Sequence, residues 1–186
     1  MKTILTMLII FFLSIGLHAQ INIGDKVMDF AARDAQGNDW LLRDHLGKKS
    51  LVIYFYPVAF TGGCTKQACA YRDKKKELDQ FDVEVIGISG DQPENLKYFA
   101  AEHGLNFMLL SDADGKVASL FGVPSGEGGI LTREIEGKEV KLPRGVTTAR
   151  WTFIVDKEGT VVYKNDNVNP EKDTQDILNF LKKTKE

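Results

Sequence analysis

The chain has 186 residues, with 26 acidic and 24 basic side chains and a formal net charge of −2 at pH 7. This weak acidity without a basic stripe argues against nucleic acid as a partner, and the length suits one well-packed domain but is short for two. Only three histidines occur, and one of them, His18, lies in the N-terminal segment described next. We therefore expect no metal site, and we also expect no cofactor.

The first twenty residues have the layout of a secretory signal peptide. A lysine precedes an apolar core from Ile4 to Leu17, and the small residue Ala19 follows. We expect cleavage after Ala19 and export, to the periplasm, of a domain of residues 20–186. The alternative is an uncleaved anchor, the only membrane attachment we expect, although the apolar stretch is shorter than the about 20 residues that span a bilayer.

The rest of the chain alternates predicted strands and helices. Short extended pieces surround a turn at 35–38, and buried strands are predicted at 51–56, 83–89, 107–110, 151–155 and 160–163, with helices from Cys64 and at about 93–103, 116–121 and 171–183. Strands separated by helices predict parallel crossovers, hence an α/β fold. Residues 124–148 are expected to form a surface hairpin or a mobile loop, and His103 is expected to end its helix.

Both cysteines follow the predicted strand 51–56. Pro57 ends that strand, a loop with two adjacent glycines follows, and Cys64 opens a polar helix. The first turn of a helix carries unpaired N–H groups and the positive end of the helix dipole, which favour a thiolate. The alternative is that Cys64 is a small buried apolar residue.

The spacing of Cys69 indicates a transient bond. On an intact helix the Cα atoms of Cys64 and Cys69 would lie about 8 to 9 Å apart, whereas a disulfide needs less than about 7 Å. The pair can close only if the first turn unwinds, as expected of a bond made and broken in a working cycle. The alternative is that the helix starts later, near Ala70, and a loop disulfide joins the two cysteines.

These residues carry a family resemblance. The segment PVAFTGGC, with Pro57, Thr61 and Cys64, matches the PxxxTxxC motif of peroxiredoxins, and CTKQAC resembles the peroxiredoxin Q or bacterioferritin comigratory protein branch. RWTFIVDKEG at 150–159 resembles the arginine-bearing strand of that family. The resemblance covers roughly residues 23–181. It departs from the family at Gly62, where proline is frequent, and at 124–148.

The resemblance implies a thioredoxin-like fold, with a central mixed β-sheet flanked by helices. It also implies a thiol-dependent peroxidase that acts on hydrogen peroxide and organic hydroperoxides. Cys64 would become a sulfenic acid, Cys69 would convert it into an intramolecular disulfide, and a thioredoxin-like protein would reduce that bond. We expect a monomer.

Four further residues receive roles from the resemblance, and each has a plainer alternative. Thr61 would hydrogen-bond the peroxide or merely cap the helix, and Arg150 would hold the thiolate and the transferring charge or form a salt bridge. Pro57 would shield the site from water or only end the strand. Gln67 would orient Arg150 or remain a solvated helix residue.

Two rival functions stay open at this point. A thioredoxin-type thiol–disulfide oxidoreductase usually carries CxxC and a proline before the next active-site strand, whereas here four residues separate the cysteines and Thr148-Ala149 precede Arg150. A non-enzymatic domain with a structural disulfide is the default for two cysteines in an exported chain. It predicts a loss of about 2 to 5 kcal/mol for Cys69→Ser.

Overall fold

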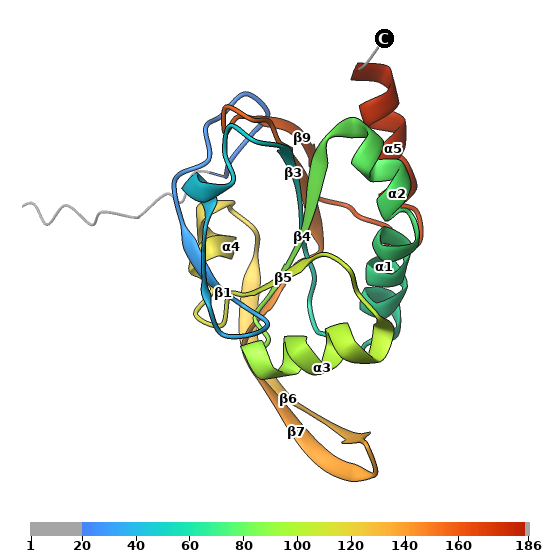
Figure 1. The fold of residues 1–186 in the computed structure, drawn as a ribbon. Helices are drawn as coiled ribbons and strands as arrows, with labels where there is room; N and C mark the ends of the chain where they lie inside the picture. The colour runs from blue at the N-terminus through green and yellow to red at the C-terminus, as the bar shows by residue number, and fades with distance from the viewer. Residues whose placement is uncertain (1–19, 185–186) are drawn as a thin grey trace, which may run out of the picture.

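The computed structural model describes residues 20–184, so the predicted leader, residues 1–19, lies outside the described residues. The fold is built on a seven-stranded sheet with the order β2-β1-β5-β4-β3-β8-β9 (Figure 1). Its strands are β1 (Ala31–Asp34), β2 (Asp39–Leu41), β3 (Ser50–Phe55), β4 (Val83–Ser89), β5 (Met108–Ser111), β8 (Trp151–Val155) and β9 (Val161–Asn165).

The sheet is mixed, and helices cover both of its faces. β3, β4 and β5 are parallel, whereas β8 pairs antiparallel with β3 and β1 antiparallel with β5. The helices are α1 (Gly62–Asp73), α2 (Lys75–Leu78), α3 (Pro93–His103), α4 (Lys116–Leu120) and α5 (Asp173–Thr184), with short 3₁₀ turns at Leu42–Asp44 and Asp79–Phe81. Figure 1 shows α1, α2 and α5 on one side of the sheet and α4 on the other. The predicted α/β fold with parallel crossovers is confirmed.

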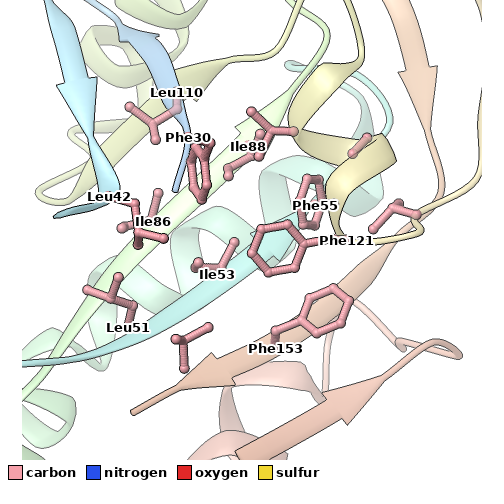
Figure 2. Close-up of a cluster of buried hydrophobic side chains, with 14 of the residues drawn as sticks. Phe30, Leu42, Leu51, Ile53, Phe55, Ile86, Ile88, Leu110, Phe121 and Phe153 are labelled. Carbon is pink, nitrogen blue, oxygen red and sulfur yellow. The ribbon is translucent and has the colours of Figure 1, made fainter. Parts of the chain in front are cut away.

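The central strand β3 divides its side chains between two hydrophobic clusters. Leu51, Ile53 and Phe55 point into the cluster beneath α4, where Phe121 and Phe153 also pack (Figure 2). Val52 and Tyr54 alternate with them and point into the cluster under α1, α3 and α5. Because both faces are buried, the strand is apolar throughout, as its sequence predicts.

Residues 124–148 form a hairpin, which is the first of the two expectations for this segment. Its strands are β6 (Ser125–Ile135) and β7 (Lys138–Thr148), which pair in a separate two-stranded sheet. Glu136 and Gly137 at the tip both have positive φ, of 52° and 75°, as a tight two-residue hairpin turn requires. The hairpin extends beyond the central sheet, past α3 (Figure 1).

Candidate active site

Cys64 lies in the first turn of α1, the helix that follows the central strand β3 along the chain. The helix begins at Gly62, its N-cap residue is Thr61 in an extended conformation, and Cys64 is 1% exposed. The prediction that Cys64 sits at a helix N-terminus is confirmed, and the alternative that the helix begins near Ala70 is wrong. The loop before α1 is short because Tyr56 still pairs with β4, through a hydrogen bond from its N–H to the carbonyl of Ile88.

Arg150 reaches the Cys64 thiol from the neighbouring strand. It immediately precedes β8, whose residue Trp151 pairs with Phe55 at the end of β3. This register brings the guanidinium to the start of α1, where Nη2 lies 3.1 Å from Cys64 Sγ. A cation at this distance stabilises a thiolate. The Arg150 side chain bonds Cys64 and Gln67, neither of which is a carboxylate, and this does not match the salt-bridge alternative.

Gln67 is buried between Arg150 and a carboxylate. Gln67 is 0% exposed, so the alternative that it is a solvated helix residue is wrong. Its Oε1 accepts a hydrogen bond from Arg150 Nη1 at 2.5 Å, and its Nε2 donates to Asp173 Oδ2 at 2.7 Å. The structure therefore brings Cys64, Arg150 and Gln67 together as the resemblance implies.

The sequence did not point to Asp173, the fourth member of this chain of contacts. Its carboxylate also accepts hydrogen bonds from the Tyr71 hydroxyl at 2.7 Å and from Thr152 Oγ1 at 2.9 Å. Burial is the main cause that raises the pKa of the Asp173 carboxyl, and these hydrogen bonds act against it. In the sequence, Asp173 resembles any acidic residue in the first turn of a helix.

Thr61 and Pro57 lie in the loop between β3 and α1. The Thr61 hydroxyl donates to the carbonyl of Val58 at 2.9 Å and makes no capping bond to the helix, so the capping alternative is wrong. A hydroxyl that donates in this way still offers oxygen lone pairs to a second donor. Pro57 is half-buried, just beyond the last residue that pairs with β4.

The same loop is held rigidly at two points. The Ala59 N–H donates to Oδ2 of the buried Asp91 at 2.8 Å. Phe60 has a positive φ of 66°, which costs energy for a residue with a side chain. Its ring packs edge-on against Phe99 at 5.1 Å, and the guanidinium of Arg133 from β6 lies 4.4 Å from its centroid. These contacts tie the loop to Asp91, to α3 and to β6.

Cys69 lies on the same continuous helix as Cys64, and both thiols are free. Cys69 is partly exposed, whereas Cys64, Gln67, Ala68 and Tyr71 face the core. Five residues along a helix correspond to a rotation of about 140°. The two thiols therefore point in different directions, and joining them requires part of α1 to unwind.

Within residues 20–184, no group of three or more His, Cys, Asp or Glu side chains is arranged to hold a metal ion. In the same part of the chain no helix is long and apolar enough to cross a membrane.

Comparison with known proteins agrees with this geometry. The model of the AhpC/TSA family matches residues 23–164. Peroxiredoxin Bcp of Escherichia coli K12 is 38% identical over 162 residues, which are 87% of this chain and 96% of that protein. The chloroplastic peroxiredoxin Q of Gentiana triflora is 37% identical over 168 residues, which are 90% of this chain and 70% of that protein.

Solved structures are similar over nearly the same range. Peroxidoxin BcpB of Mycobacterium tuberculosis has a TM-score of 0.73 and 32% identity, and the match covers 88% of this chain and 98% of that one. A bacterioferritin comigratory protein of Xanthomonas campestris, studied for its alkyl peroxide reduction activity, has a TM-score of 0.70 and 28% identity over 89% of this chain and 98% of its own. The predicted thioredoxin-like fold is confirmed. The chain belongs to the AhpC/TSA family and is a peroxiredoxin, a thiol-dependent peroxidase similar to peroxiredoxin Q and bacterioferritin comigratory protein.

Proposed function

We propose that Cys64 is the thiol that attacks the peroxide and that Cys69 is the thiol that resolves the product. The observation that carries this proposal is the contact of 3.1 Å between Arg150 Nη2 and the buried sulfur of Cys64. Cys69 is instead partly exposed and interacts with Arg72, whose guanidinium also bonds Asp73 and the carbonyl of His103. The two cysteines are therefore chemically different, as two successive roles require.

In the first step, the Cys64 thiolate attacks one oxygen of a hydroperoxide. The O–O bond breaks, the leaving oxygen takes a proton and departs as water or an alcohol, and Cys64 becomes a sulfenic acid. The sulfur loses two electrons and the peroxide gains them. Arg150 offsets the negative charge that moves along the O–O bond. The Thr61 oxygen accepts a hydrogen bond from the peroxide, and Pro57 limits the access of water.

In the second step, the Cys69 thiolate attacks the sulfur of the Cys64 sulfenic acid. The S–O bond breaks, hydroxide leaves and is protonated to water, and a disulfide forms. Helix α1 must unwind locally for this step, because the two thiols point in different directions on the intact helix. The disulfide protects Cys64 from irreversible oxidation.

A dithiol protein of the thioredoxin type then returns two electrons through a mixed disulfide.

The alternative function, a thioredoxin-type oxidoreductase, is disfavoured, since Cys69 lies deep in the helix and Cys64 contacts an arginine. We further propose that the substrates include organic hydroperoxides, in line with the alkyl peroxide reduction described for the Xanthomonas campestris relative.

A coupled assay tests this cycle. Reduced thioredoxin, thioredoxin reductase and NADPH are supplied with hydrogen peroxide or cumene hydroperoxide, and NADPH oxidation is followed. We expect steady turnover for the wild type, no turnover for Cys64→Ser, and loss of thioredoxin-supported turnover for Cys69→Ser. Equal NADPH oxidation by all three proteins would contradict the assignment of both cysteines.

A further inference from the structure

The Asp173 carboxylate gathers three hydrogen bonds on a single oxygen. It is the first residue of α5 and is completely buried. Gln67 from α1, Tyr71 from α1 and Thr152 from β8 all donate to Oδ2, at 2.7, 2.7 and 2.9 Å. The other oxygen, Oδ1, is buried and has no hydrogen-bond partner within residues 20–184. A buried carboxylate with one unbonded oxygen destabilises the fold. The presence of Asp173 therefore points to a role other than stability.

The chemistry of Gln67 supplies that reason. A guanidinium can only donate hydrogen bonds, and an ionised carboxylate can only accept them. With Arg150 on one side and Asp173 on the other, the amide has one favourable orientation, with its oxygen toward Arg150 and its nitrogen toward Asp173. In the flipped amide, NH₂ would face the guanidinium and the carbonyl would face the carboxylate. The carboxylate thereby selects the orientation in which Gln67 can hold Arg150.

The segment that carries Asp173 packs against the start of α1. Lys66 of α1 pairs with Glu171 at 2.5 Å. A side-chain carbon of Pro170 lies 3.5 Å from the point where Gly63 would carry a Cβ atom. This segment thus contacts α1 through Pro170, Glu171 and Asp173, which keeps the carboxylate in register with Gln67.

We propose that Asp173 is a positioning residue for peroxide reduction, which fixes the amide of Gln67 so that Arg150 stays on the Cys64 sulfur. The inference rests on the proposed roles of Cys64 and Arg150. It also has a consequence for the second step, because Gln67 lies between the two cysteines. When α1 unwinds for disulfide formation, the bond from Gln67 to Asp173 breaks, and Arg150 loses its support until the disulfide is reduced.

The test separates Asp173 from the other groups around it. In a Cys69→Ser background, oxidation of Cys64 by hydrogen peroxide is followed by rapid quenching with a thiol-alkylating reagent and intact mass. We expect Asp173→Ala to slow this rate about tenfold, the equivalent of about 1.4 kcal/mol. Asp173→Asn restores at least half of the wild-type rate, because its carbonyl can accept the same three hydrogen bonds. Asp173→Ser, too short to reach Gln67, matches Asp173→Ala and replaces it should the alanine variant not fold.

The matched controls are Tyr71→Phe and Thr152→Val, each of which removes one donor to the same oxygen but leaves Gln67 in place. We expect both to lose stability and to keep the rate within about twofold. In a Gln67→Ala background, Asp173→Ala should add no further loss, since Asp173 acts through Gln67. The inference is overturned if Asp173→Ala reacts as fast as the parent, or if Tyr71→Phe slows the reaction as much as Asp173→Ala. It is also overturned if the rate losses of Asp173→Ala and Gln67→Ala multiply in the double variant. If the parent itself does not react rapidly, the proposed function fails instead.

Discussion

At the scale of single residues, the site depends on the two-pronged shape of one guanidinium. Arg150 uses Nη2 for the Cys64 sulfur and Nη1 for Gln67. A lysine ammonium is a compact charge on a flexible stem and cannot reproduce this planar fork. A positive charge alone is therefore insufficient to support the Cys64 sulfur, because the Arg150 guanidinium must also keep its orientation.

We accordingly expect Arg150→Lys to slow oxidation of Cys64 by roughly 10- to 100-fold, the range expected for loss of a charge-directed contact in the transition state. The rate is measured by rapid mixing with hydrogen peroxide. The matched control is Arg144→Lys, which changes a part-buried arginine of the hairpin that bonds Thr147 and should leave the rate unchanged. An unaltered rate in Arg150→Lys would contradict the role of the fork.

The buried Asp173 also predicts a pH dependence of stability. Burial raises the pKa of its carboxyl above the ordinary value of 3.8, so the native state binds this proton more readily than the unfolded chain. Stability associated with that proton is present at low pH and is lost as the pH rises from 3.8 through the native pKa. We expect urea unfolding to show that the wild type gains stability relative to Asp173→Asn as the pH falls from 7 toward 4. A stability difference that does not change with pH would contradict this account.

Residue types in a local pattern were predictable from the sequence, and the long-range partner Arg150 was predictable through the family resemblance, whereas Asp173 was not. Cys64, Thr61 and Pro57 belong to one contiguous segment, and Gln67 follows within a turn of helix. Asp173 is 106 positions away from Gln67. No local pattern distinguishes its buried role from the ordinary occurrence of acidic residues in the first turn of a helix.

At the scale of elements, the start of α1 is well defined, although glycine occupies its first position. Thr61 has φ −78° and ψ 149°, a conformation compatible with a following proline. A Cβ atom on Gly62 would meet nothing within 4 Å. Position 62 can therefore accept a proline.

We expect Gly62→Pro to raise the free energy of unfolding of the reduced protein by about 0.4 to 1 kcal/mol, since proline restricts the unfolded chain and suits the first position of a helix. Urea unfolding measures the change. Gly62→Ala is the control, with a smaller gain. A loss of stability in Gly62→Pro would mean that Gly62 does not hold this conformation.

The base of the β6–β7 hairpin depends on close backbone contact. The N–H of Gly145 donates to the carbonyl of Gly90 at 2.9 Å, and a Cβ atom on Gly145 would lie 1.9 Å from the carbonyl oxygen of Ala113. We expect Gly145→Ala to destabilise the protein by roughly 1 to 3 kcal/mol through this overlap. Gly126→Ala, where a Cβ meets nothing within 4 Å, should be close to neutral. Equal unfolding midpoints for the two variants would contradict the tight docking.

The strands of the main sheet and the helices that cover it were predictable from the sequence pattern. The strands β3 and β4 are largely apolar runs, and α3 ends at a glycine in the left-handed conformation. The hairpin was harder to predict. Its strands are mostly exposed and interrupted by glycines, so burial imposes little pattern on them. Only the alternation around Gly137 indicated its pairing.

At the scale of the whole molecule, we propose that residues 1–19 direct the export of the protein to the periplasm. The support is the lysine, apolar core and small residue of that segment. Expressed with this segment in a Gram-negative host, the protein should be found in the periplasmic fraction, with an intact mass that lacks residues 1–19. A membrane-bound protein that retains Met1 would support the anchor instead.

The central claim is that Cys64 reacts with peroxide and Cys69 resolves the product. Intact mass of the fully reduced mature protein, before and after one equivalent of hydrogen peroxide, tests it most directly. We predict a rapid loss of two hydrogens in the wild type, a gain of one oxygen in Cys69→Ser, and no fast reaction in Cys64→Ser. Equally slow reaction of all three proteins would contradict the account and leave the cysteine pair as a structural or exchange-active bond.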